Sequence, residues 1–257
     1  MRHYAAMAGR FAGRIALVTG AAGGIGTATS RLFAAEEARV VCVDLDGGAA
    51  AATAAAIVAD GGDAIGIACD VTEADACAAA MDAAVDAHAR LDVLVNVAGV
   101  GGFAPTTDVT LDEWNRTLAV NLTGTFLMCQ RALPHLVESR GCIVNVASVA
   151  GVRAVPYNAA YCASKAGVVM LTKSLAVEYG RRGVRANCVC PSSVDTAFLD
   201  GFAFTDEMDM SLFARGSSVL AGVMDPRVVA DAIAYLASDA AGMITGSTLM
   251  LDGGATA

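Results

Sequence analysis

The sequence predicts a single α/β domain built on a parallel β-sheet. The chain has 257 residues, a length that suits one domain with a well-buried core. Short apolar runs at 15–18, 93–95 and 143–146 alternate with longer helical patterns, as expected when each strand is followed by a crossover helix. No linker, second domain or low-complexity tract interrupts this alternation.

The first strand leads into a glycine-rich turn. The apolar run 15–18 is typical of a strand covered on both faces, and residues 19–26 follow it with the spacing G-x-x-x-G-x-G before a helical stretch at 27–37. Glycines at such a turn let the backbone approach a pyrophosphate, and the helix behind it offers free N–H groups. Glycine-rich turns also close ordinary αβ units, so both interpretations stay open for this motif alone.

The second strand, 39–43, is followed by Asp44, eighteen residues after Gly26. A dinucleotide-binding fold places near there the carboxylate that accepts hydrogen bonds from the adenosine ribose. A carboxylate repels a 2′-phosphate, and neither the glycine turn nor the residues just after Asp44 include an Arg or Lys. We therefore predict NAD rather than NADP as cofactor. The alternative is that Asp44 only caps the next helix.

Four helical stretches follow further along the chain. Alanine clusters at 49–56 and 76–84 predict compact helices, a long helix is predicted over 111–140, and another over 158–179. The last carries a small, apolar face through Ala163, Ala166, Gly167 and Met170, which suits close helix pairing but also an ordinary core face.

Tyr161 and Lys165 are four residues apart on this last predicted helix and so share one face. An ammonium beside a phenol favours the phenolate, and we expect it to lower the pKa of Tyr161 from about 10 toward neutrality. Such a phenol exchanges a proton near physiological pH. A lone Tyr-x-x-x-Lys pair is common by chance, so its weight comes from the motifs around it.

Taken together, these motifs resemble the short-chain dehydrogenase/reductase family over nearly the whole chain from about Phe11. The glycine turn resembles the family's T-G-x-x-x-G-x-G motif, and residues 96–99 its N-N-A-G segment with Val97 for the second Asn. Residues 252–254 resemble the close of the family's last strand. The resemblance implies a single doubly wound Rossmann-type domain, a seven-stranded parallel sheet flanked by helices on both faces.

The resemblance also implies roles for individual residues. Tyr161 would exchange the proton of the substrate oxygen, Lys165 would hold the nicotinamide ribose, Ser148 would polarise the carbonyl and Asn121 would hold a relay water. A helix cap for Ser148, a helix kink for Asn121 and a core aromatic for Tyr161 are the structural alternatives. The cofactor-binding positions implied are Gly20, Gly24, Ile25, Gly26, Asp44, Asp70, Val71, Asn96, Ala98, Gly99, Tyr161, Lys165, Pro191, Val194 and Thr196.

Residues 191–224 correspond to the segment that covers the active site in relatives, and we call them the lid segment. Ser192 stands where the family has glycine, and Thr196 matches the position that binds the nicotinamide carboxamide. The lid segment carries an apolar set suited to a hydrophobic pocket: Phe198, Leu199, Phe202, Phe204, Met208, Met210, Leu212 and Phe213. The hypothesis is a lipophilic secondary alcohol or ketone, such as a steroid, terpenoid or aryl alcohol. The alternative is that these residues only dock the lid segment onto the core.

Two other functions are considered. A 3-oxoacyl-carrier-protein reductase shares the catalytic motifs, but that branch docks its acidic carrier with basic residues, and Pro134 occupies one such position while Arg182 keeps the other. It also generally prefers NADPH, which Asp44 opposes. A non-catalytic NAD-binding scaffold predicts a damaged catalytic set, whereas all four positions are intact here.

Composition limits the remaining possibilities. The net charge of −9 argues against nucleic-acid binding, and no apolar run is long enough for a membrane span. The eight cysteines show no metal-ligand spacing, so we expect free thiols in a reducing cytoplasm and no metal site. Residues 1–10 lack an apolar signal region, and we expect a disordered tail there, with the domain over 11–257. From the family we expect a homotetramer acting on a small alcohol or ketone.

Overall fold

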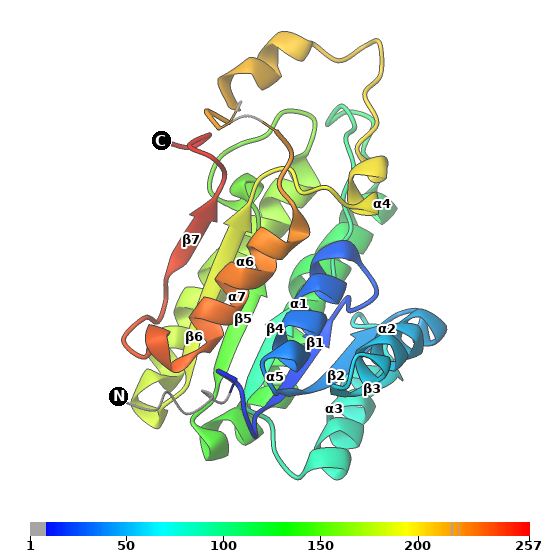
Figure 1. Cartoon of the computed structure of the whole chain (residues 1–257). Helices are drawn as coiled ribbons and strands as arrows, with labels where there is room; N and C mark the ends of the chain where they lie inside the picture. Colours follow the sequence, from blue (N-terminus) through cyan, green and yellow to red (C-terminus); the bar gives the residue numbers. More distant parts are fainter. Residues whose placement is uncertain (1–8, 217, 221) are drawn as a thin grey trace.

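Seven parallel strands form one sheet in the computed structural model, which describes residues 9–216, 218–220 and 222–257. The strands are β1 (Ile15–Thr19), β2 (Arg39–Asp44), β3 (Asp63–Ala68), β4 (Val93–Asn96), β5 (Cys142–Val146), β6 (Arg185–Pro191) and β7 (Thr248–Leu251). Their order is β3-β2-β1-β4-β5-β6-β7, so the winding direction reverses between β1 and β4. The predicted doubly wound, seven-stranded parallel sheet is confirmed (Figure 1).

Helices cover both faces of the sheet. One core packs between the sheet and α1 (Gly24–Ala35), α2 (Gly47–Ala59) and α7 (Pro226–Ala237). The other core packs against α3 (Ala74–His88), α5 (Gly124–Ser139) and α6 (Ala159–Tyr179). Neighbouring strand residues divide between the two cores, with Leu17 and Val18 as an example, because successive side chains point to opposite faces. Burial on both faces explains why the strands are almost uniformly apolar.

The long helix predicted over 111–140 is interrupted. It consists of α4 (Leu111–Leu118), a π-helical turn (Ala119–Thr123) and α5, which is followed by Arg140 in the left-handed conformation. Thr110 and Glu113 form a capping box at the start of α4. The backbone stays helical through the π turn, so the predicted extent was right and the predicted regularity was wrong. π turns inside helices are frequent at functional sites, and this one contains Asn121.

Helix α1 begins three residues earlier than predicted, at Gly24 instead of residue 27. The last glycines of the turn therefore form the first turn of the helix, which brings its free N–H groups closer to the carboxyl end of β1. The helix predicted over 158–179 is confirmed as α6, and Asp44 forms the last residue of β2.

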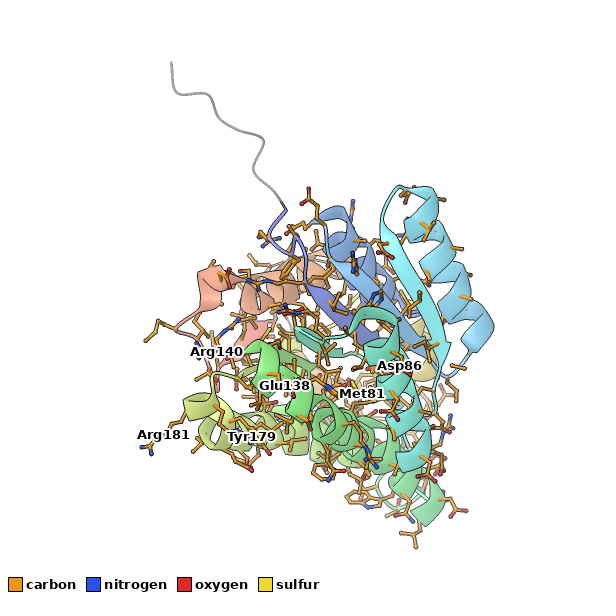
Figure 2. All side chains as sticks on the ribbon, turned by 90° about the horizontal axis from the view of Figure 1, so that it is seen from below. Met81, Asp86, Glu138, Arg140, Tyr179 and Arg181 are labelled. Carbon is orange, nitrogen blue, oxygen red and sulfur yellow. The ribbon has the colours of Figure 1, made fainter. Side chains whose placement is uncertain are left out.

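The outer faces of α5 and α6 expose apolar side chains, among them Phe126, Met170 and Val177. The expected tetramer contact on these helices stays a prediction. Seen from below in Figure 2, the end of α5 near Arg140 lies beside the end of α6 near Tyr179. Arg140 also packs against the backbone of Gly183, just after α6.

Part of the expected N-terminal tail belongs to the domain. Arg10 forms an ion pair with Glu36, and Phe11 is fully buried with its ring edge-on to Phe33. Residues 1–8 lie outside the described residues. None of the helices in the described part of the chain is long and apolar enough to cross a bilayer.

A chain of buried amides connects the middle of the sheet to α6. Asn96 Nδ2 donates to Asn145 Oδ1 (2.9 Å), Asn145 Nδ2 donates to Thr172 Oγ1 (2.9 Å), and Thr172 Oγ1 donates to the carbonyl of Val168 (2.7 Å). Asn145 and Thr172 are fully buried, so each bond replaces one that water would otherwise supply.

We expect Asn145→Ala to lower the free energy of unfolding by about 2–4 kcal/mol, because Asn96 and Thr172 each lose a buried hydrogen bond and a cavity opens. Urea unfolding measures the change. Asn115→Ala, an exposed residue of α4, is the matched control and should stay within about 0.5 kcal/mol of the wild type. A loss below about 1 kcal/mol for Asn145→Ala would show that the amide chain is not a stabilising connection.

Candidate active site

A crevice opens where β1 and β4 end side by side. The hydroxyl of Thr19 accepts hydrogen bonds from the backbone N–H groups of Val97 (3.1 Å) and Ala98 (3.3 Å). Gly20 has a φ of +63°, and a Cβ there would lie 2.8 Å from the nitrogen of Ala98. Only glycine fits this close, left-handed position. In doubly wound sheets, ligands bind in the crevice at such a reversal of strand order.

The glycine turn folds tightly against itself. A Cβ on Gly26 would lie 2.0 Å from the carbonyl oxygen of Gly20, and one on Gly24 would lie 2.3 Å from Cγ2 of Thr196. The Asp44 carboxylate accepts a hydrogen bond from the N–H of Ala22 (3.0 Å). The alternative that Asp44 only caps the next helix is wrong, because Asp46 caps α2 and Asp44 instead ties the end of β2 to the glycine turn.

Asp70 and Val71 line the same cleft after β3. The Asp70 carboxylate accepts from the N–H (2.9 Å) and hydroxyl (2.7 Å) of Thr72, which forms a tight turn. A Cβ on Gly124 would meet Cγ2 of Val71 at 2.7 Å, so the start of α5 fixes Val71 at the cleft wall.

Tyr161, Lys165 and Ser148 lie together, nearly buried, at the floor of the cleft. Lys165 Nζ lies 5.6 Å from the centre of the Tyr161 ring and donates to the carbonyl of Val146 (2.9 Å). Ser148 follows β5 directly and hydrogen-bonds with Tyr161, and its hydroxyl also accepts from the N–H of Ala150 (3.1 Å). The helix positions the phenol and ammonium, and the strand end positions the hydroxyl.

Burial shifts both titrating groups away from their charged forms. It raises the pKa of Tyr161 to about 12, with the Ser148 hydrogen bond acting in the opposite direction, and it lowers the pKa of Lys165 to about 8. The prediction that Lys165 lowers the pKa of the phenol toward neutrality is wrong for the chain itself. Desolvation of the phenol is the largest cause of its raised pKa.

Asn121 lies in the π turn, next to the site, and is fully buried. Its Oδ1 accepts from the N–H of Val100 (2.8 Å), and its Nδ2 donates to the carbonyl of Val100 (2.9 Å) and to Ser164 Oγ (3.0 Å). A Cβ on Gly99 would lie 3.2 Å from Asn121 Oδ1 and 3.5 Å from Lys165 Nζ. The side chain of Asn121 thus joins the loop after β4 to the catalytic helix, and its amide is engaged by protein groups.

Most of the residues predicted for the site line one cleft of about 1250 Å³. Gly26, Asn96 and Asn121 are not part of the lining. Gly26 instead closes the glycine turn, and Asn96 points into the buried amide chain, with Nδ2 also 3.4 Å from Cys129 Sγ. The predicted residues that line the cleft are Gly20, Gly24, Ile25, Asp44, Asp70, Val71, Ala98, Gly99, Ser148, Tyr161, Lys165, Pro191, Val194 and Thr196.

The lid segment covers the cleft above Tyr161. Residues Ala197–Gly201 and Met210–Gly216 form 3-10 turns. Ser192 does not adopt a positive φ, and its N–H donates to the carbonyl of Leu251 (2.9 Å), so the serine at the family's glycine position carries no left-handed strain. Met208 is buried and Met210 exposed, and neither lines the cleft.

Sequence reasoning missed part of the lining. Phe103, Arg116, Arg153 and Asn158 border the cleft but belong to no motif. Their position after a strand is the feature that could have predicted them. Phe103 follows β4 and Arg153 follows β5, and the loops after parallel strands carry binding residues. Within the described ranges, no group of three His, Cys, Asp or Glu side chains is placed to hold a metal ion.

The cleft fits a nicotinamide dinucleotide. Gly20 and Gly24 remove the side chains that would keep a pyrophosphate from the start of α1, and the helix supplies N–H groups there. Asp44 lies at the end of β2, where a ribose would be held, and Lys165 and Tyr161 lie at the other end of the same cleft.

Comparison with known proteins agrees with this geometry. A family model described as enoyl-(acyl carrier protein) reductase matches residues 20–256. D-threitol dehydrogenase of Mycolicibacterium smegmatis is 44% identical, over 96% of this chain and 94% of its own. Cis-4-hydroxycyclohexanecarboxylate dehydrogenase of Sinomonas cyclohexanicum is 41% identical, over 96% and 98%. The crystal structure of 3-ketoacyl-(acyl-carrier-protein) reductase from Brucella melitensis, complexed with NADH, has a TM-score of 0.88 at 34% identity and covers 96% of this chain and 100% of that chain.

The chain belongs to the short-chain dehydrogenase/reductase family. It is an oxidoreductase acting on CH–OH donors, with a nicotinamide cofactor. The scaffold alternative is therefore set aside. If Tyr161 accepts the alcohol proton, as the resemblance to the family implies, its phenolate must be present for oxidation, and its pKa then sets the pH dependence.

We expect kcat/KM for alcohol oxidation to rise from pH 7 toward pH 8, because a Tyr161 pKa raised to about 12 leaves little phenolate at pH 7, and to gain less above pH 8, where the Lys165 ammonium loses its proton. Ser148→Ala removes the hydrogen bond that lowers this pKa, so the pH–rate profile should move to higher pH by roughly 0.5–1 unit. The same variant should lose about 10²–10³ in kcat, because the carbonyl loses a polarising donor. Steady-state rates across pH measure both effects.

Tyr161→Phe is the control for this experiment. It should abolish turnover at every pH while leaving NADH binding, followed by cofactor emission, almost unchanged. A Ser148→Ala profile that stays in place or moves to lower pH would contradict the assignment.

Proposed function

We propose that the protein is an NAD-dependent dehydrogenase that interconverts a lipophilic secondary alcohol and its ketone, with Tyr161 as acid and base. The observation that carries this proposal is the aromatic composition of the cleft above Tyr161. Five phenylalanines, which we call the aromatic wall, line it: Phe103, Phe198, Phe202, Phe204 and Phe213. Such a lining favours an apolar substrate held against a few polar groups.

The catalytic residues divide the work by position. Ser148 donates a hydrogen bond to the substrate oxygen and polarises it as charge develops there. Tyr161 accepts the hydroxyl proton in oxidation and returns it in reduction, and Lys165 lies beside it to balance the phenolate. When bound, the nicotinamide accepts or donates the hydride. Asn121 holds the loop at Val100 against the catalytic helix, so it acts by keeping these groups in place.

Relatives act on both kinds of alcohol. D-threitol, the substrate named for the 44% identical relative, is a small polyol, whereas cis-4-hydroxycyclohexanecarboxylate is built on an apolar ring. Family membership therefore does not choose between them. The aromatic wall supports the ring-bearing class, because a phenylalanine offers a polyol hydroxyl no conventional hydrogen-bond partner.

Asp44 supports NAD as the physiological cofactor. Its carboxylate lines the cleft and is anchored on Ala22 N–H, so it is held where a 2′-phosphate would approach. The residues after it are Leu45 and Asp46, which supply no balancing positive charge.

We expect NADH to bind about 10–100 times more tightly than NADPH, because a fixed carboxylate repels the 2′-phosphate. Asp44→Ala should reduce that ratio to within about threefold of unity. Asp46→Ala is the matched control, since Asp46 caps α2, lies two residues away and is not part of the cleft lining, and it should leave the ratio unchanged. Titrations followed by cofactor emission measure all three proteins. Wild-type preference for NADPH would contradict the NAD assignment.

With NAD, we expect kcat/KM for cyclohexanol and 1-phenylethanol to exceed that for D-threitol and meso-2,3-butanediol by at least about tenfold. The aromatic wall packs favourably against an apolar substrate, whereas it leaves the hydroxyls of a polyol without hydrogen-bond partners. Initial rates across the panel decide. A higher value for D-threitol would contradict the lipophilic substrate.

The carrier-protein reductase stays as the alternative outcome of these experiments. The Brucella reductase supports it by likeness, but Pro134 lies exposed on α5 where that branch has a basic docking residue. Higher activity with an acyl-thioester and NADPH than with any alcohol and NAD would favour it.

A further inference from the structure

The lid segment contacts the loop that follows β4 through glycines. A Cβ on Gly102 would lie 2.8 Å from the carbonyl oxygen of Gly201, and a Cβ on Gly201 would lie 2.8 Å from the carbonyl oxygen of Gly101. The two segments pack backbone against backbone at these positions, so neither segment has room for a side chain there. We call Gly101, Gly102 and Gly201 the glycine seam. It lets residues 197–202 lie directly on the loop that follows β4.

The space above Gly101 is filled by two rings. A Cβ on Gly101 would lie 2.6 Å from Cζ of Phe202 and 2.9 Å from Cδ2 of Tyr161. Phe202 lies edge-on to Tyr161, with ring centres 5.7 Å apart and planes at 84°. The glycine seam thus allows a lid residue to touch the catalytic phenol directly.

Phe202 also connects the phenol to the rest of the aromatic wall. Its ring lies 5.0 Å from Phe103, which in turn contacts Phe204 and Phe213 at 5.2 Å each. Phe204 forms no ring contact with Tyr161 and is more than half exposed. Within the wall, Phe202 therefore combines contact with Tyr161 and contact with Phe103.

Further contacts through Tyr157 and Gly253 hold the lid segment in this position. The hydroxyl of Tyr157 accepts a hydrogen bond from the N–H of Asp209 (2.8 Å), and its ring stacks on Phe213 at 5.9 Å. The carbonyl of Gly253 accepts from the N–H groups of Val219 (2.9 Å) and Leu220 (3.1 Å). The placement of Phe202 is thus part of a lid fixed at several points.

We propose that Phe202 is the specificity-determining residue of this site, and that the glycine seam positions it. The Phe202 ring lines the cleft beside the Tyr161 ring, so it would face a substrate whose hydroxyl reaches the phenol. A carbinol carbon within a saturated or aromatic ring presents C–H edges or a flat face to that ring, which is the contact that aromatic side chains favour. A vicinal diol presents its second hydroxyl there instead, without a hydrogen-bond partner on Phe202. The substrate class is therefore a cyclic secondary alcohol. This inference rests on the proposed function.

The experiment compares kcat/KM for cyclohexanol with kcat/KM for meso-2,3-butanediol, both with NAD. In Phe202→Ala we expect the cyclohexanol-to-diol ratio to fall at least about tenfold, mainly through a higher KM for cyclohexanol. Phe202→Leu, which keeps the apolar volume, should fall by an intermediate factor. Met210→Ala is the matched control, because it removes a large apolar side chain from the same lid segment that is exposed and does not line the cleft, and its ratio should stay within about threefold of the wild type.

Gly201→Ala tests the glycine seam separately. The added methyl group meets the Gly101 carbonyl and should displace Phe202, so we expect the ratio to fall in the same direction as in Phe202→Ala. NADH affinity and the thermal midpoint, measured on every variant, should stay close to the wild-type values and so exclude loss of the fold.

The outcomes separate this inference from the proposed function. A ratio unchanged in Phe202→Ala, or one that falls equally in Met210→Ala, would overturn the role of Phe202 whatever substrate the wild type prefers. A wild type that prefers the diol would contradict the lipophilic substrate. If Phe202→Ala then made the diol still more favoured, Phe202 would nevertheless be the residue that sets the ratio.

Discussion

The close contact between the end of β1 and the loop after β4 is the constraint on which the rest of the site depends. Thr19 accepts two backbone hydrogen bonds from this loop, and Gly20 turns away in a conformation that only glycine adopts readily. Because the strand order reverses here, the crossover helices leave to opposite sides and the crevice stays open. The glycine turn and the loop after β4 are therefore held at one place by the same contact.

Burial of the predicted catalytic groups costs solvation free energy. Tyr161 and Lys165 are almost completely buried, and burial disfavours the charged form of each. Polar contacts offset part of this cost, since Lys165 donates to Val146 and Ser148 hydrogen-bonds with the phenol. The lid segment contributes to the burial, because Phe202 packs on the Tyr161 ring. The position of the lid segment and the acidity of the phenol are thus linked through one contact.

Two sets of hydrogen bonds between residues far apart in the sequence hold this arrangement together. Asn121 joins the loop at Val100 to α6 from the π turn, and the buried amides of Asn96 and Asn145 join the sheet to α6 from beneath. None of the amide side chains of Asn96, Asn121 and Asn145 lines the cleft. The amide of Asn121 is satisfied within the protein, whereas Asn96 Oδ1 is buried without a hydrogen-bond partner.

The sequence by itself determined the sheet, the glycine turn, Asp44 at the end of β2 and the pairing of Tyr161 with Lys165. These follow from local spacing, because a strand buries every residue and a helix repeats its face after four. The π turn at Asn121, the raised pKa of Tyr161 and the packing of Phe103 on Phe202 were decided by the tertiary structure alone. Each depends on how closely segments far apart in the chain approach one another. Desolvation and steric fit between such segments produce no local sequence pattern from which they could be predicted.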